Sequence, residues 1–187
     1  MGHGLLGELQ LHELLLRFDE DLAATCRASG CRGCGGALHS ARYPRKPRGG
    51  PPGLPPEYRS RMSFCCARCR GRTTPRSLRY LGRRVYLAAV VVLMSALRYG
   101  LTPRRAQQLA QSMGVPRRTL ERWRRWWLEG FIRTSFWKGA GARLVPPVLI
   151  AALPASLLER FTGDDSQSRL IQSLRFLSPL SSLSDGA

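Results

Sequence analysis

The chain opens with apolar side chains at spacings of three to four residues. This period is typical of an α-helix that buries one face, and it predicts a helix over residues 5–28. Gly30 follows as a plausible stop signal. The predicted apolar face consists of Leu5, Leu9, Leu15, Phe18 and Leu22.

A helical pattern returns from Ser77 onward. The first helix is expected over Arg83–Tyr99, and its apolar run "VYLAAVVVLMSAL" has 13 residues. That length is too short to cross a bilayer and is typical of a buried core helix. A second helix should begin at Pro103 after a Thr102 cap, and a third should run from Pro116 to about Glu129. The segments "LPASLLERF" and "SRLIQSLRFL" favour two short helices before a Ser-rich end.

Residues 31–72 follow a different pattern. "ALHSARY" is short enough for one strand, and "PRKPRGGPPGLPPE" is too rich in proline and glycine for a helix or a central strand. "YRSRMSFC" then alternates as a second strand does. Its predicted inward residues are Tyr58, Met62, Phe64 and Cys66.

These elements predict a mainly α fold with a small β zinc ribbon and a three-helix domain built around a helix-turn-helix. Four regions are expected along the chain. They are an N-terminal helix (1–28), a zinc ribbon (29–76), a helix-turn-helix domain (77–137), and short helices with a flexible tail (138–187).

Two Cys-x-x-Cys pairs flank the predicted strands: Cys31 with Cys34, and Cys66 with Cys69. Four thiolates from two tight turns are the ligand set of a structural Zn²⁺ site. Metal binding would supply folding free energy, on the order of 10 kcal/mol, that so short a segment cannot gain from its core. A redox dithiol is the competing interpretation. Cys66 is preferred to Cys65 as the ligand, because it shares its strand face with Phe64.

The charge balance is strongly basic. There are 30 Lys and Arg against 12 Asp and Glu, which gives a net charge of +18. Such a chain usually has a polyanionic partner, most often nucleic acid. The N-terminus lacks the basic start of a signal peptide, and no segment is long enough to span a membrane, so a cytoplasmic protein with reduced thiols is expected.

"AQQLAQSMGVPRRTLERWRRWW" has the spacing of a helix-turn-helix. Gly114 permits the tight turn, and Val115, Leu120 and Trp123 supply apolar contacts. A structural helical hairpin with a glycine turn can imitate this pattern. The outward face, which a recognition helix would present to the major groove of double-stranded DNA, consists of Arg117, Arg118, Thr119, Glu121, Arg122 and Arg125. Arg70 and Arg72, beside the second cysteine pair, are expected to contact phosphates. A homodimer is possible, although no dimer signature is visible.

The order of parts, from the cysteine pairs through "RGRTTPRS" to the helix-turn-helix, resembles the N-terminal part of bacterial insertion-sequence transposases. It also resembles short bacterial proteins with the same pairing. The likeness covers about residues 26–130. In such transposases this region recognises DNA ends, and a separate RNase-H-like domain cuts the DNA with three acidic residues. This chain departs there, because few acidic residues follow the helix-turn-helix and none lies in a convincing strand. The resemblance therefore implies the DNA-binding part without the catalytic part.

The leading hypothesis is a DNA-binding transcriptional regulator, or a transposase-like recognition protein, that is not an enzyme. The main alternative is an RNA- or ribosome-associated zinc-ribbon protein. A nuclease with an unrecognised site and a protein-interaction adaptor are the other hypotheses.

Overall fold

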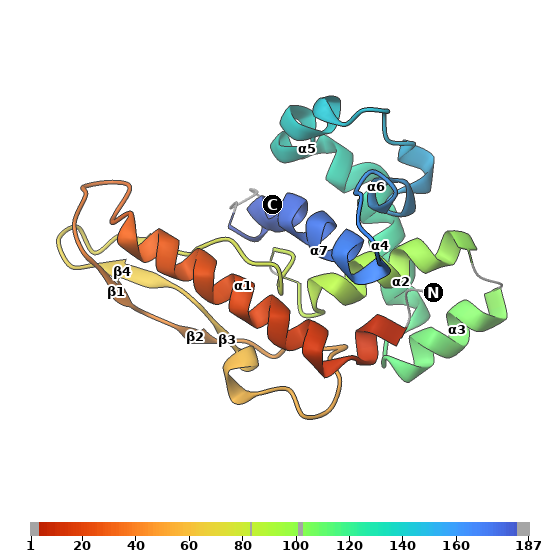
Figure 1. The fold of residues 1–187 in the computed structure, drawn as a ribbon, viewed down its shortest axis with the longest axis horizontal. Coiled ribbons are helices and arrows are strands. Elements are labelled where there is room, and N and C mark those ends of the chain that lie inside the picture. The colour runs from red at the N-terminus through yellow and green to blue at the C-terminus, as the bar shows by residue number, and fades with distance from the viewer. Residues whose placement is uncertain (1–3, 83, 101–102, 183–187) are drawn as a thin grey trace.

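The computed structural model describes residues 4–82, 84–100 and 103–182 (Figure 1). Helices dominate and a small antiparallel sheet accompanies them, which agrees with the expected balance of elements. The helices are α1 (Leu9–Ala28), α2 (Ala88–Gly100), α3 (Pro103–Ser112), α4 (Arg117–Arg125), α5 (Ser135–Ala140), α6 (Ala155–Leu158) and α7 (Ser166–Leu177). The strands are β1 (Leu38–Ser40), β2 (Tyr43–Pro44), β3 (Ser60–Arg61), β4 (Phe64–Cys66) and β5 (Arg72–Thr73). A π-helical segment (Trp126–Gly130) continues α4, and 3-10 turns occupy Gly4–Gly7, Pro56–Arg59, Phe131–Arg133, Gly141–Arg143, Ile150–Ala152 and Ser178–Ser181.

Helix α1 confirms the predicted first helix, but its buried face is rotated from the predicted one. Of the expected apolar residues Leu15 is fully buried, whereas Leu9, Phe18 and Leu22 are half-buried, and the side chain of Leu5 lies outside the described set. The inward face is formed by Leu11, His12, Leu15, Leu16, Asp19 and Ala23. Because two residues of that face, His12 and Asp19, are polar, apolar periodicity alone does not indicate it. The helix ends where expected, with Gly30 at a φ of +71°.

The two predicted strands form a small sheet in which β4 lies between β1 and β5, all antiparallel. Leu38 pairs with Cys66, and Cys65 pairs with Arg72. The four predicted inward residues of the second strand are all buried. That stretch is divided, however, into a 3-10 turn, β3 and β4. Strand β3 pairs with β2 in a separate two-stranded sheet.

Helix α2 is the central element of the core, as its apolar run predicts. Val90, Val91 and Val92 are fully buried. The helix packs against α3, α4, α6 and α7. The loop between β2 and β3 also packs against this helix, since a Cβ at Gly49 would lie 2.8 Å from a methyl group of Val90.

The helix expected over Arg83–Tyr99 begins later than predicted, at Ala88. The described part of the Ser77–Leu87 segment contains no helix, so that part of the prediction is wrong. The reason is Arg79, a fully buried residue whose guanidinium makes several tertiary hydrogen bonds. These bonds hold the segment in an irregular conformation.

Arg79 joins three parts of the chain. Its Nε donates to the Asp19 carboxylate at 2.8 Å, and its terminal nitrogens donate to the carbonyls of Tyr58 and Ser60, both at 3.1 Å. Asp19 also accepts from the Ser77 hydroxyl and from the Leu78 N–H. The buried ion pair is therefore fully hydrogen-bonded, as a buried charge must be.

Helix α7 and the turn after it close the other side of the core. Leu170, Leu174 and Leu177 are buried. The Ser181 hydroxyl accepts from the Ser77 N–H at 2.7 Å, and the Ser181 carbonyl accepts from Arg61 at 3.4 Å. A segment late in the chain thus packs against the region between the sheet and α2. In the described ranges, no helix combines the length and the apolar character needed to cross a bilayer.

Candidate metal centre and basic surfaces

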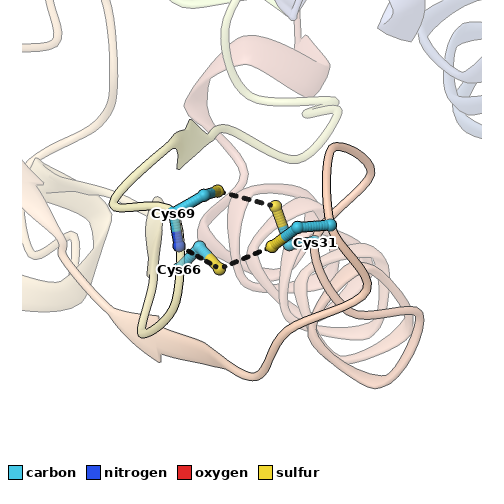
Figure 2. Close-up of side chains that lie close together, drawn as sticks. Cys31, Cys66 and Cys69 are labelled. Atoms are coloured by element: carbon cyan, nitrogen blue, oxygen red, sulfur yellow. Dashed lines mark hydrogen bonds between the residues drawn. The ribbon is translucent and has the colours of Figure 1, made fainter.

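The four cysteines of the two Cys-x-x-Cys pairs converge at one end of the molecule. Their sulfur atoms all lie within 4.8 Å of one another. The Sγ atoms of Cys31 and Cys69 are 3.5 Å apart, and those of Cys34 and Cys66 are also 3.5 Å apart. Figure 2 shows Cys31, Cys66 and Cys69 turned toward one another from two separate turns. The cysteines are free thiols, so the cluster is a candidate metal site and not a disulfide pair.

The two turns, here named the first knuckle (Cys31–Gly36) and the second knuckle (Cys66–Gly71), share one backbone pattern. In each, the N–H of the first cysteine donates to the last glycine carbonyl, at 2.9 and 3.0 Å. The carbonyl of that cysteine accepts from the residue after the second cysteine, at 2.7 Å for Gly35 and 3.1 Å for Arg70. This local pairing aims both thiols of each knuckle at the opposite knuckle.

The geometry fits a tetrahedral sulfur site. A Zn–S bond of about 2.3 Å places neighbouring sulfurs of a tetrahedron about 3.8 Å apart. The sulfur separations of 3.5 Å and below 4.8 Å bracket that value. Backbone N–H groups of Arg68 and Cys69 also point at the Cys66 sulfur, at 3.3 and 3.5 Å. Such N–H groups stabilise a thiolate, which is the form that binds metal.

The same contacts shift the pKa values of the thiols in opposite directions. The N–H of Cys69, aided by the N–H of Arg68, lowers the pKa of Cys66 to about 6. The Gly71 N–H acts to lower the pKa of Cys69, but the neighbouring sulfurs Cys31, Cys34 and Cys66 together raise it to about 12. A cluster that holds negative charge on some sulfurs opposes ionisation of the rest, and a divalent cation would relieve this repulsion.

The other two cysteines and the histidine of the sheet lie outside the cluster. Cys65 sits on the opposite strand face from Cys66, and its sulfur lies 3.5 Å from the Arg70 carbonyl. His39, which pairs with Cys65 across the sheet, is exposed. Cys26 is half-buried at the end of α1. The preference for Cys66 over Cys65 as the member of the cluster is therefore confirmed.

Exposed arginines surround the knuckles. Arg70 and Arg72, the two predicted phosphate contacts, are exposed, and Arg72 lies on the edge strand β5. Arg32, on the first knuckle, and Arg68, on the second, are exposed as well. These four residues, Arg32, Arg68, Arg70 and Arg72, are named the knuckle surface below.

Helices α3 and α4 are joined by a tight turn packed on α2. Gly114 has a φ of +60°, as the turn pattern predicts, and its N–H donates to Gln111. The Tyr86 hydroxyl, just before α2, donates to the Gly114 carbonyl at 3.2 Å. The Tyr86 ring also meets Trp123 edge to face, with centroids 5.0 Å apart. Tyr86 thus positions the turn and α4 together, a role that the sequence pattern did not reveal.

The predicted inward and outward sides of α4 are both observed. Val115 and Trp123 are buried and Leu120 is half-buried. The side chains of Leu109 and Ala110 in α3 lie outside the described set, and so does Thr102, the predicted cap of that helix. The outward residues Arg117, Arg118, Glu121, Arg122 and Arg125 are exposed, and Thr119 is half-buried. The four arginines among them are named the α4 surface below.

Glu121 is engaged by its own helix. Its carboxylate accepts from the Arg117 Nε at 2.9 Å, one turn away. Because both side chains are exposed, this pair contributes little to stability and can open when a partner binds.

The tryptophans after α4 form an aromatic cluster. Trp127 and Phe131 are fully buried, and Trp126 is half-buried. The Arg84 guanidinium stacks over the Trp126 ring, 4.1 Å from the ring centroid. The cluster therefore extends the core beyond the end of α4, with Arg84 packed against its half-buried member.

No second metal-ligating cluster accompanies the cysteines in the part of the chain that the structure describes. In particular, Glu129, Glu159, Asp164 and Asp165 do not gather there as a carboxylate group. Asp165 caps α7 by accepting from the Ser168 N–H, and this bond lowers its pKa. Asp185, the other acidic residue after α4, lies outside the described residues.

The fold and the site together define a helix-rich protein with one four-cysteine cluster and two arginine-rich surfaces. Comparison with known proteins found no match among protein-family models, curated proteins or solved structures.

Proposed function

We propose that the protein binds double-stranded DNA through α3 and α4, acting as a helix-turn-helix, and that the four cysteines hold a structural Zn²⁺. The observation that carries the proposal is the two-sided character of α4. Trp123 fixes the helix against α2, while the α4 surface faces solvent with four guanidinium groups. A rigid, exposed, cationic helix after a glycine turn is what major-groove recognition requires.

The four arginines of the α4 surface would contact DNA in two ways. Arg118, Arg122 and Arg125 recur at spacings of four and three, so they form one row along α4. Such a row can reach guanine edges bidentately or grip flanking phosphates. Arg117 is held by Glu121 and would be released on contact. The proposal contains no catalytic step and describes a transcriptional regulator or a transposase-like recognition protein.

Zinc would act structurally. Four sulfurs close the coordination sphere and leave no open position for a substrate. The ion would hold the two knuckles together and stiffen the edge strand that carries Arg72. The proposed setting is a compartment that keeps thiols reduced, such as the cytoplasm.

The test is a selection of random duplex oligonucleotides on the purified full chain loaded with Zn²⁺, with a metal-stripped sample beside it. The α4 variant is Arg117→Gln with Arg118→Gln. The matched control is Arg133→Gln with Arg143→Gln, which removes the same charge from exposed positions on neither surface. We expect an enriched motif in the wild type and in the control. The α4 variant should lose enrichment, with affinity reduced at least tenfold.

Two outcomes would overturn the proposal. Equal binding of the α4 variant and the control would mean that charge alone attracts DNA. Preference for structured RNA over duplex DNA in direct competition would favour the RNA- or ribosome-associated alternative. A palindromic motif would instead extend the proposal to a homodimer.

A further inference from the structure

The knuckle surface is a second concentration of positive charge, separate from the α4 surface. Its four arginines are exposed around the sulfur cluster, and no acidic residue occurs between Asp21 and Glu57 or between Glu57 and Glu121. None of the ion pairs formed by the described residues involves this surface. The surface is therefore uncompensated and suited to a polyanion.

Arg70 gives independent reason to assign a function to this surface. Its φ is +60°, and it is the one non-glycine residue with positive φ in the described part of the chain. The equivalent place in the first knuckle is Gly35, with a φ of +70°. The second knuckle therefore places an arginine where the same turn, elsewhere in this chain, uses glycine. Unfavourable backbone conformations cluster at functional sites, which gives a reason to look for a role of the Arg70 side chain.

The two basic surfaces lie apart. Figure 1 shows the knuckle end of β1 and β4 at one end of the long axis and α4 beyond the middle of the molecule, toward the other end. Helix α1 runs between them, and its exposed side chains include three carboxylates (Glu13, Glu20 and Asp21) and two guanidinium groups (Arg17 and Arg27). The exposed charge of α1 is thus net negative, whereas both arginine-rich surfaces are positive, so a straight duplex along α1 gains no net attraction between the two surfaces. Each surface is better placed to meet its own segment of DNA.

We propose that the knuckle surface binds a second duplex, so that one copy of the protein bridges two DNA segments. The inference rests on the proposed function, because it assigns the first duplex to the α4 surface. The knuckle contacts are to phosphates. Arginine side chains on a tight turn can grip the backbone but do not enter a groove as a helix does.

The experiment measures capture of one duplex by another. A biotinylated duplex on beads is saturated with Zn²⁺-loaded protein, and a second, fluorescent duplex of the same sequence is added. The knuckle variant is Arg68→Gln, Arg70→Gln and Arg72→Gln. The control is Arg133→Gln, Lys138→Gln and Arg143→Gln, three exposed cations elsewhere. Binding to a single duplex and the mass of the free protein are measured for each variant.

We expect the wild type and the control to retain the fluorescent duplex, and the knuckle variant to lose at least nine-tenths of it. Its affinity for one duplex should change less than about threefold. The salt dependence of second-duplex capture should fall by about 2.7 in log–log slope, for three lost phosphate contacts.

Three results would overturn the inference. Retention of the second duplex by the knuckle variant, together with a dimeric mass, would show that two copies of α4 do the bridging. Tight binding of one duplex without any capture would remove the bridge and leave the proposed function standing. Absence of duplex binding by the wild type would remove both.

Discussion

At the scale of single residues, Arg70 and Gly35 occupy the same position in the two knuckles, one with a side chain and one without. Both have positive φ, and both N–H groups donate to the first cysteine of their knuckle. A side chain in this conformation costs about 1–2 kcal/mol, part of which glycine loses again through its greater freedom in the unfolded chain. Arg70 is thus a residue at which stability and proposed binding are opposed.

We therefore expect Arg70→Gly to stabilise the metal-loaded protein by about 0.5–1 kcal/mol. Gly35→Ala should destabilise it by a similar amount, since a Cβ there meets no atom within 4 Å and only the backbone conformation is unfavourable. Urea unfolding of the two variants measures both effects. A loss of stability in Arg70→Gly would show that the side chain serves the fold.

Asp19 provides a second test at this scale. Asp19→Asn would leave the Arg79 guanidinium buried without its countercharge, and we expect a loss of about 3–5 kcal/mol. Glu121→Gln breaks the exposed pair with Arg117, where Glu121 is 47% and Arg117 is 91% exposed, and should cost less than about 0.5 kcal/mol. Chemical denaturation of both variants distinguishes a structural ion pair from a surface one. Similar losses would contradict the assignment.

At the scale of elements, local patterns predicted most of the helices, the strand stretches and the cysteine cluster. They failed where a polar residue faces the core. His12 accepts a hydrogen bond from the Tyr58 hydroxyl at 3.0 Å and lies within 3.2 Å of the Leu6 carbonyl. A polar residue thus occupies a buried position of α1, and the apolar pattern does not mark that position as buried. The prediction of a helix in the Ser77–Leu87 segment was wrong for the same reason, because the Arg79 guanidinium bonds to residues of α1 and to residues 57–60. Partners so distant in sequence leave no periodic signal.

Metal removal should separate the elements that depend on the cluster from those that do not. With a chelator present, we expect amide hydrogen exchange to increase strongly over both knuckles, β1, β4 and β5. Cys34→Ser should act in the same direction. Amides of α2 and α4 should stay protected, because their contacts run through Tyr86 and Trp123, away from the sulfurs. Loss of protection in α2 would mean that the cluster supports the whole core.

At the scale of the whole molecule, the core is continuous from α1 to the turn after α7. Helix α2 is covered by α7 among others, and Arg61 and Ser77 reach the turn at Ser181. The proposed DNA-binding helices thus share one core with the segment around Arg79.

A truncation after Asp165 tests this dependence, because it removes α7 with buried Leu170, Leu174 and Leu177. Exposing the α2 face that they cover should leave the protein unfolded or aggregated, judged by loss of the near-ultraviolet circular dichroism of its tryptophans. The control ends at Ser182 and keeps every contact of α7 described above. A folded, soluble chain ending at Asp165 would contradict a shared core.

The contact of Ser181 with Ser77 and Arg61 also bears on how the chain folds during synthesis. Residues far apart in sequence must meet before the core closes, and such long-range contacts form slowly. The valines of α2 leave the ribosome well before α7 has been made, so a nascent chain carries uncovered apolar surface for many seconds at ordinary rates of translation. The knuckles, whose partners are nearer in sequence, can assemble first, around the proposed Zn²⁺. The protein would then depend on chaperones during its own synthesis more than its small size suggests.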